Sequence, residues 1–176
     1  MSKLFLTLHV LAAIVAVGPV TVAASMFPKV LREALAAPDD ARPVTTLRTL
    51  HRISRVYGGL GIAVVAFGFA TASSMDVLAS PWLITSIGLT FLAALILLLL
   101  VLPRQETALA AVAGPESPDG DARAADGTAT GPEGAVAVRP DARTSAQLAM
   151  YTGVFNVLWA TVTILMIVRP GSTTGA

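Results

Sequence analysis

The chain has 176 residues, of which 55% are hydrophobic and only 13% are charged, and its formal net charge is +1. Soluble domains carry about 25% charged residues, so this chain has too few polar side chains to cover a water-soluble fold. A charge this close to neutral gives no support for nucleic acid as a partner. The chain contains no cysteine, which excludes disulfides, thiolate metal ligands, thiol catalysis and cysteine-attached haem.

Four stretches are long and apolar enough to cross a bilayer as helices, because a crossing needs about 20 predominantly apolar residues. None of the four contains Asp, Glu, Lys or Arg, and in chain order they are 4–26, 56–74, 82–102 and 146–168. A cleaved signal peptide is the alternative for the first, although its apolar stretch exceeds the usual ~7–15 residues. The sequence therefore predicts an all-α membrane protein, a four-transmembrane-helix bundle in contact with the lipid bilayer.

The connections divide the chain into three parts with different charge. Residues 1–102 hold three helices and an inner loop at 27–55, residues 103–145 form a linker, and residues 146–176 hold the fourth helix and a short tail. The loop and the linker together carry ten basic residues, and the rest of the chain carries two. Cytoplasmic connections concentrate Lys and Arg. We therefore expect a multi-pass protein of the cell (cytoplasmic) membrane with both termini outside.

The loop at 27–55 has helical character of its own. Apolar residues recur at helical spacing at Leu47, Leu50 and Ile53, while the arginines between them fall on another side. This pattern predicts an amphipathic inner-face helix that runs into the second span, with its cations at the lipid headgroups. The segment 29–37 is likewise expected to extend the first span past Pro28.

The linker at 103–145 is rich in Ala, Gly and Pro and contains no aromatic residue. Such a segment buries too little apolar surface to offset the entropy lost on ordering. We therefore expect a disordered cytoplasmic linker between the third and fourth spans.

His9 is the strongest candidate for a functional side chain in the spans. It lies about 8 Å inside the outer boundary of the first span, counted from Leu4 at ~1.5 Å per residue. Imidazole can ligate a metal and exchange a proton near neutral pH, and Ala12, Ala13 and Ala16 leave space beside it. The alternative is a neutral imidazole that forms a hydrogen bond across a helix interface.

Hydroxyl side chains of the other spans fall at a depth similar to that of His9. Ser86 and Thr90 lie in the outer half of the third span, and Thr163 lies in the outer half of the fourth. Together with His9 they define a candidate cofactor-binding pocket that opens to the outside. The alternative is that each hydroxyl bonds a carbonyl of its own helix, as Ser and Thr commonly do in membrane helices.

For other residues the sequence predicts a role in helix packing or at the headgroups rather than in catalysis or ligand binding. Asn156 lies near the centre of the fourth span, where its amide must find a partner on another helix. Gly58, Gly61 and Gly68 give the second span a face for close helix packing. His51 is expected at the inner headgroups, about 25 Å from His9, so the two histidines should not share one haem.

Three strings in the spans resemble a known family: LTLHVLAAIVAVGPVTVAASMFPKVLR, LHRISRVYGGLGIAVVAFGFATASSM and AMYTGVFNVLWATVTILMIVRPG. They resemble an uncharacterised, chiefly bacterial family of predicted integral membrane proteins, the domain of unknown function two-two-six-nine. That family is distantly similar to CopD-like membrane proteins and to the four-helix haem-dependent protoporphyrinogen oxidases. In those relatives a first-helix histidine followed by a glycine resembles His9 with Gly18, and the resemblance implies haem as the cofactor.

Three functions follow from these observations. The first is a non-catalytic structural or accessory membrane protein with other membrane subunits as partners, which the scarcity of ionisable residues in the spans favours. The second is a haem-binding membrane redox protein that uses His9, which the resemblance favours. The third is copper or small-solute transport, which the spans support least because they contain no charged residue and no cluster of methionines.

Overall fold

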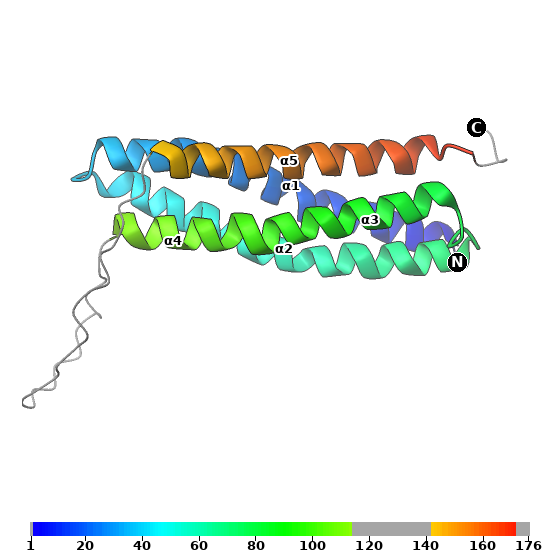
Figure 1. Ribbon diagram of the computed structural model, residues 1–176. Coiled ribbons are helices and arrows are strands. Elements are labelled where there is room, and N and C mark those ends of the chain that lie inside the picture. Colours follow the sequence, from blue (N-terminus) through cyan, green and yellow to red (C-terminus); the bar gives the residue numbers. More distant parts are fainter. Residues whose placement is uncertain (1, 114–141, 172–176) are drawn as a thin grey trace, which may run out of the picture.

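The computed structural model describes residues 2–113 and 142–171 of the chain (Figure 1). Within these residues, four helical segments are long and apolar enough to cross a membrane. The helices are α1 (Ser2–Ala36), α2 (Ala41–Ser74), a continuous run of α3 (Pro81–Leu95), η1 (Ile96–Val101) and α4 (Leu102–Ala113), and α5 (Ala142–Val168). The prediction of an all-α four-helix bundle is confirmed.

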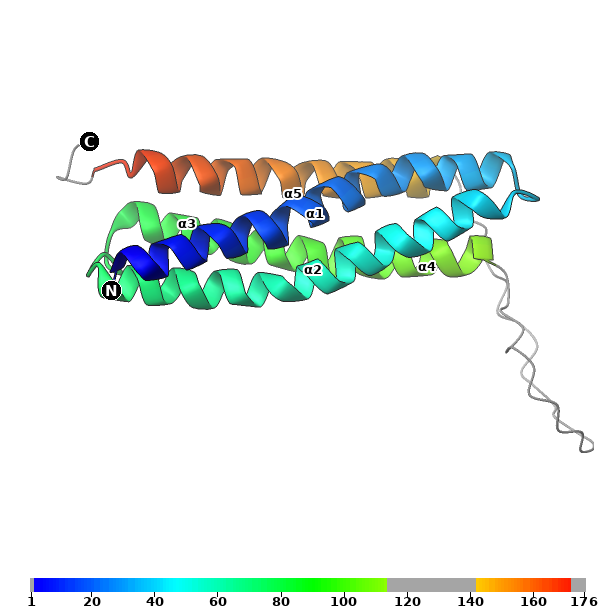
Figure 2. The same ribbon diagram turned by 180° about the vertical axis from the view of Figure 1, so that it is seen from behind.

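The four segments lie lengthwise beside one another, and both views show the same arrangement of their ends (Figures 1 and 2). We call the end at which α1 begins and α5 finishes the terminal end, and the opposite end, at which α4 finishes and α5 begins, the linker end. Helix α1 thus starts at the same end of the bundle at which α5 stops, as an even number of crossings requires.

Two short turns reverse the chain between the helices. At the linker end, α1 stops at Ala36, and the side chain of Asp40 accepts a hydrogen bond from the backbone N–H of Arg42 (3.0 Å) to begin α2. At the terminal end, Asp76 adopts a left-handed conformation (φ 57°), and Pro81 occupies the first turn of α3. Proline is favoured there because the first N–H groups of a helix have no partner within it.

The first two helices extend beyond the predicted spans in the way that the sequence indicated. Helix α1 continues through Pro28 to Ala36. The amphipathic segment that begins near Leu47 is the linker-end part of α2, and it buries Leu47 and Leu50. Those two side chains pack against Phe27 and Leu31 of α1, so the apolar side of the segment faces another helix of the bundle.

The third helical segment is longer than predicted, and the linker is correspondingly shorter. The helix passes through Pro103 to Ala113, and α5 begins at Ala142, so the two ends of the predicted disordered linker at 103–145 are helical. The reason is packing: Ala108 is buried in an apolar cluster with residues of α1, α2 and α5. The middle of the predicted linker lies outside the described residues.

The third segment changes its helical form just before Pro103. Residues 96–101 form a wider π-helical turn, in which the N–H of Leu102 donates to the carbonyl of Leu97, five residues earlier. Proline lacks an N–H, and its ring clashes with the carbonyl four residues before it. A wider turn moves that carbonyl away and lets the helix continue past the proline.

The buried core consists of two apolar clusters. One lies at the linker end around Phe27, Leu31 and Leu148, and the other lies nearer the middle around Val101 and Phe155. Large apolar side chains also cover the outside of the bundle, and Ile62 and Ile167 are each 76% exposed. An outer surface of this kind is typical of helices that face lipid.

The helices do not approach one another equally. Helix α1 packs closely on α2, and α3 packs on α5, whereas close backbone approaches between α2 and α3 are few or absent. Taken over its whole length, the third segment approaches α5 more often than α1 does, so we describe the bundle as two helix pairs, α1 with α2 and the third segment (α3, η1 and α4) with α5. The pairs are joined mainly by contacts of α1 with α5 and of α2 with α4.

Candidate functional site

His9 joins α1 to α2. Its Nδ1 lies 2.9 Å from the carbonyl oxygen of Val64, and because a carbonyl only accepts, Nδ1 carries the proton and donates it. The imidazole also occupies the space beside Gly68, where an added Cβ would lie 2.9 Å from Cε1 and 3.1 Å from Nδ1. The side chain therefore forms an interhelical hydrogen bond, and its Nε2 keeps an unprotonated lone pair in the neutral form.

The hydroxyl groups that we grouped with His9 bond within their own helices. Ser86 donates to the carbonyl of Trp82, Thr90 to that of Ser86, and Thr163 to that of Trp159, at 2.8, 2.8 and 2.9 Å. Each bond spans four residues of one helix, which is the usual arrangement for Ser and Thr in membrane helices. A shared site of these hydroxyls with His9 stays a prediction.

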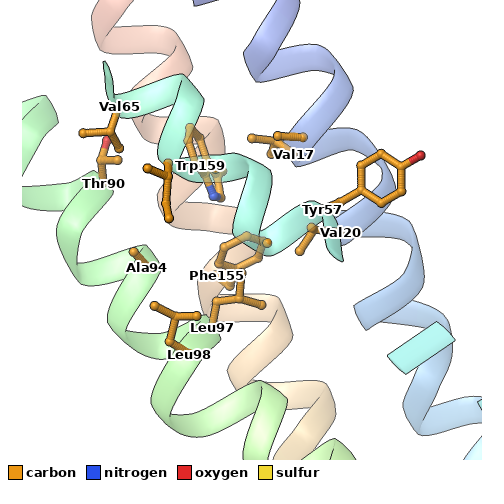
Figure 3. A pocket seen from close by; sticks show the side chains of 14 residues that line it. Val17, Val20, Tyr57, Val65, Thr90, Ala94, Leu97, Leu98, Phe155 and Trp159 are labelled. Carbon is orange, nitrogen blue, oxygen red and sulfur yellow. The ribbon is translucent and has the colours of Figure 1, made fainter. Parts of the chain in front are cut away.

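A cavity of about 140 Å³ lies between the two helix pairs (Figure 3). Its lining comes from α1, α2, α3, η1 and α5, and includes Val17, Gly61, Leu97, Phe155 and Trp159. The lining is almost entirely apolar, because the hydroxyl of Thr90 is already bonded within its helix.

The cavity opens sideways, towards the surroundings of the bundle. Three of its lining residues, Ile62 and Val65 of α2 and Leu98 of η1, also have large exposed surfaces. They lie on the side where α2 and α3 hardly approach each other. An apolar cavity of about 150 Å³ can hold one benzene ring, so this space suits a single ring or a short piece of hydrocarbon chain.

His9 does not line the cavity. The lining on α1 begins at Ala16, and at ~1.5 Å of rise per residue this is about 10 Å along the helix from His9. On α2 the lining reaches Val65, next to the residue whose carbonyl His9 bonds, but His9 itself is not a lining residue. The single-ring size of the space is also far smaller than a porphyrin, which contains four pyrrole rings.

A second group of polar side chains lies between the two apolar clusters, towards the linker end. We call it the polar layer, and it consists of His51 and Ser54 on α2, Arg104 and Gln105 on α4, and Thr152 on α5. Nδ1 of His51 lies 3.4 Å from Oε1 of Gln105, and the guanidinium carbon of Arg104 lies 4.4 Å from the centre of the Tyr151 ring. These two contacts bring α2, α4 and α5 together at one level.

His51 and Asn156 complete the set of polar residues that the sequence singled out. His51 is half-buried, with Nδ1 3.4 Å from Oε1 of Gln105, and its position at the headgroups stays a prediction. Asn156 donates from Nδ2 to Oγ of Ser25 at 3.0 Å, which joins α5 to α1 as expected for an amide in a membrane helix. His9 and His51 contact different parts of the bundle, so the structure does not bring them together.

The polar layer was not predicted, although the sequence contains a pattern that identifies two of its residues. Gln105 follows Leu97 and Val101 at steps of four residues, and all three are buried. Ser54 follows Leu47 and Leu50 on the buried face of α2 in the same way. Continuing each buried face past the predicted end of the span identifies both residues.

Comparisons of the chain with protein-family models, with curated proteins and with solved structures give no match. The resemblance to an uncharacterised membrane family therefore stays an expectation. In residues 2–113 and 142–171, no three His, Asp or Glu side chains come together in a group that could hold a metal ion.

Proposed function

We propose that the chain is a non-catalytic accessory protein of the membrane, which binds hydrocarbon groups of the bilayer through the cavity between its two helix pairs. The observation that carries the proposal is the lining of that cavity, which offers apolar surface and an opening at Ile62, Val65 and Leu98. A hydrocarbon group can bind there without a hydrogen bond or a catalytic side chain, because burial of apolar surface alone contributes about 25 cal/mol per Å².

The occupant that fits best is a lipid hydrocarbon chain. The exposed residues at the opening are all apolar, so in a bilayer they would contact the hydrocarbon chains of lipids. Other membrane subunits remain candidate partners for the accessory role, through the exposed apolar surface that surrounds the opening.

Trp159 supplies a direct test, because it lines the cavity and the chain contains only one other tryptophan, Trp82. In a Trp82→Phe background, vesicles whose phosphatidylcholine is brominated in mid-chain should quench Trp159 fluorescence. Gly61 also lines the cavity, and a Cβ there would meet nothing within 4 Å, so Gly61→Leu should fill the space and reduce the quenching.

Gly59→Leu is the matched control, since Gly59 lies on the same helix, has the same free space at its Cβ and does not line the cavity. Equal quenching in the two leucine variants would contradict the proposal.

Haem binding by His9 is the second candidate, and one observation favours it. Histidines that bind metals usually donate their other ring N–H to a carbonyl or carboxylate, which is what Nδ1 of His9 does towards Val64. Nε2 would then be the ligand atom, and haem would supply redox chemistry. The single-ring cavity lies elsewhere in the bundle, so we place this candidate second; an absorption spectrum separates the two.

A further inference from the structure

The polar layer contains buried hydrogen-bond donors that have no partner among the described residues. In residues 2–113 and 142–171, the buried side-chain atoms without a hydrogen-bond partner are Ser54 Oγ, Arg104 Nη1, Gln105 Nε2, Thr152 Oγ1 and Asn156 Oδ1. Four of these atoms belong to the polar layer. Buried polar groups are almost always hydrogen-bonded, so a group of such atoms at one level indicates a bound species.

Three of these side chains are almost completely buried, and Arg104 is half-buried. Ser54 and Gln105 are 0% exposed and Thr152 is 2% exposed, and they come from three different helices. His51 approaches Oε1 of Gln105 at 3.4 Å, which leaves the Nε2 amide group of Gln105 as a donor. The layer is therefore a built cluster within the bundle and not a set of surface residues.

Arg104 gives the layer its charge. Among the described residues no carboxylate lies within 4 Å of it, and its contact in the layer is the face of the Tyr151 ring at 4.4 Å. Stacking on a ring uses the face of the guanidinium and leaves its N–H groups at the edge. A guanidinium, an amide N–H and two hydroxyls form a donor set that suits a phosphate.

Asn156 lies one helical turn beyond Thr152, and its unpartnered atom is an acceptor, so it does not belong to this donor set.

The position of the layer also fits an anion of the membrane surface. Arg104 comes two residues after the apolar run that ends at Leu102, where the third helical segment leaves the hydrocarbon region. Basic pockets between transmembrane helices at this level bind anionic lipid headgroups. The cavity of the proposed function begins one helical turn nearer the middle of the bundle, at Tyr57 and Phe155, and shares no residue with this layer.

We propose that Arg104, Gln105 and Thr152, with Ser54 beside them, bind the phosphate of an anionic amphiphile at the linker end of the bundle. Arg104 supplies the charge, and the amide and hydroxyl groups supply neutral hydrogen bonds to the phosphate oxygens.

The test follows the thermal unfolding of the whole protein in a nonionic detergent during titration with short-chain phosphatidylglycerol. The midpoint should rise and saturate, and it should rise less with short-chain phosphatidylcholine. Arg104→Gln should weaken the apparent affinity for phosphatidylglycerol about tenfold or more. The control is Arg55→Gln, which removes the same charge from an exposed residue next to Ser54 and should keep the affinity of the parent.

A titration with inorganic phosphate alone distinguishes a site for lipid headgroups from a site for free phosphate. If it raises the midpoint in the parent and not in Arg104→Gln, the site binds free phosphate, and the anion site itself is supported. If Arg104→Gln does not fold, Thr152→Val keeps the shape of the side chain and should weaken the affinity about three- to tenfold. The proposal is overturned if neither anion stabilises the parent, or if the folded variants respond as the parent does, since the layer then holds water only.

Discussion

Gly68 and His9 determine together how α1 and α2 approach each other. The imidazole occupies the place that a side chain at position 68 would fill, and from there it reaches the carbonyl of Val64. Interhelical hydrogen bonds in membranes contribute about 0.6 kcal/mol on average and up to about 1.7 kcal/mol. The ring and the glycine therefore act as one packing unit.

Gly68→Ala tests this unit. Because the new Cβ would lie 2.9 Å from Cε1 of His9, the ring must move and its hydrogen bond must weaken. We expect a loss of about 1–2 kcal/mol in the free energy of unfolding, measured in detergent, after the helix-forming advantage of alanine is included. Gly59→Ala, whose Cβ would meet nothing within 4 Å, should be neutral or slightly stabilising.

The same substitution in a His9→Ala background provides the decisive comparison. With the imidazole gone, Gly68→Ala should cost nothing, because residues in contact give non-additive effects. An equal loss in both backgrounds would show that Gly68 is needed for some other contact.

At the scale of single residues, the sequence was sufficient to select His9 but not its partner. Gly58, Gly61 and Gly68 all looked alike as close-packing residues, yet an added Cβ would meet His9 only at Gly68. Which glycine faces the imidazole depends on the rotation of α2 about its axis, and that rotation is set by packing along the whole helix.

At the scale of elements, α4 is the largest difference between expectation and structure. Its sequence, LPRQETALAAVA, has a proline at its second position, followed by charged and polar residues, so it looked like the start of a linker. Alanine has the highest intrinsic helix propensity, and burial of Ala108 against other helices stabilises the helix further. Those contacts are tertiary, and a pattern of residues along one segment does not contain them.

The spans themselves were predictable because they depend on local composition alone. Long runs without charge mark them, and Pro38 with Asp39 and Asp40 marks the turn that follows α1. The polar layer was not predictable in the same way, since its members become neighbours only when α2, α4 and α5 pack together.

Ala110→Pro tests whether α4 contributes to the folded protein. Residue 110 is exposed and lies inside the helix, so a proline there removes one backbone hydrogen bond and clashes with the preceding turn. We expect a loss of about 3 kcal/mol in the free energy of unfolding. Ala110→Gln, a good helix former at the same exposed position, should have little effect. Equal stability of the two variants would mean that α4 does not support the bundle.

At the scale of the whole molecule, charge predicts the orientation of the bundle. The segments 27–55 and 103–145 carry ten of the twelve basic residues, and the structure puts the beginning of α2 and the end of α4 at the same end of the bundle. We therefore expect the linker end to face the cytoplasm, where Lys and Arg are enriched.

Reporter fusions test this orientation. An alkaline phosphatase fused after Ala176 should be active, because that enzyme folds only outside the cytoplasm, and the same enzyme inserted within 114–141 should be inactive. A fluorescent protein that folds in the cytoplasm should give the opposite pair of results at the same two positions. Activity of the phosphatase at the internal position would reverse the topology.

The bundle combines two helix pairs, an interhelical hydrogen bond from His9 and an apolar cavity that His9 does not line. We propose that His9 stabilises the bundle through this hydrogen bond and does not hold a haem. The absorption spectrum of the protein purified from membranes, measured for the parent, His9→Ala and His51→Ala, tests this most directly. We predict no Soret band in any of the three, together with a loss of about 1 kcal/mol of stability in His9→Ala. A Soret band that is present in the parent, lost in His9→Ala and kept in His51→Ala would show instead that His9 is a haem ligand.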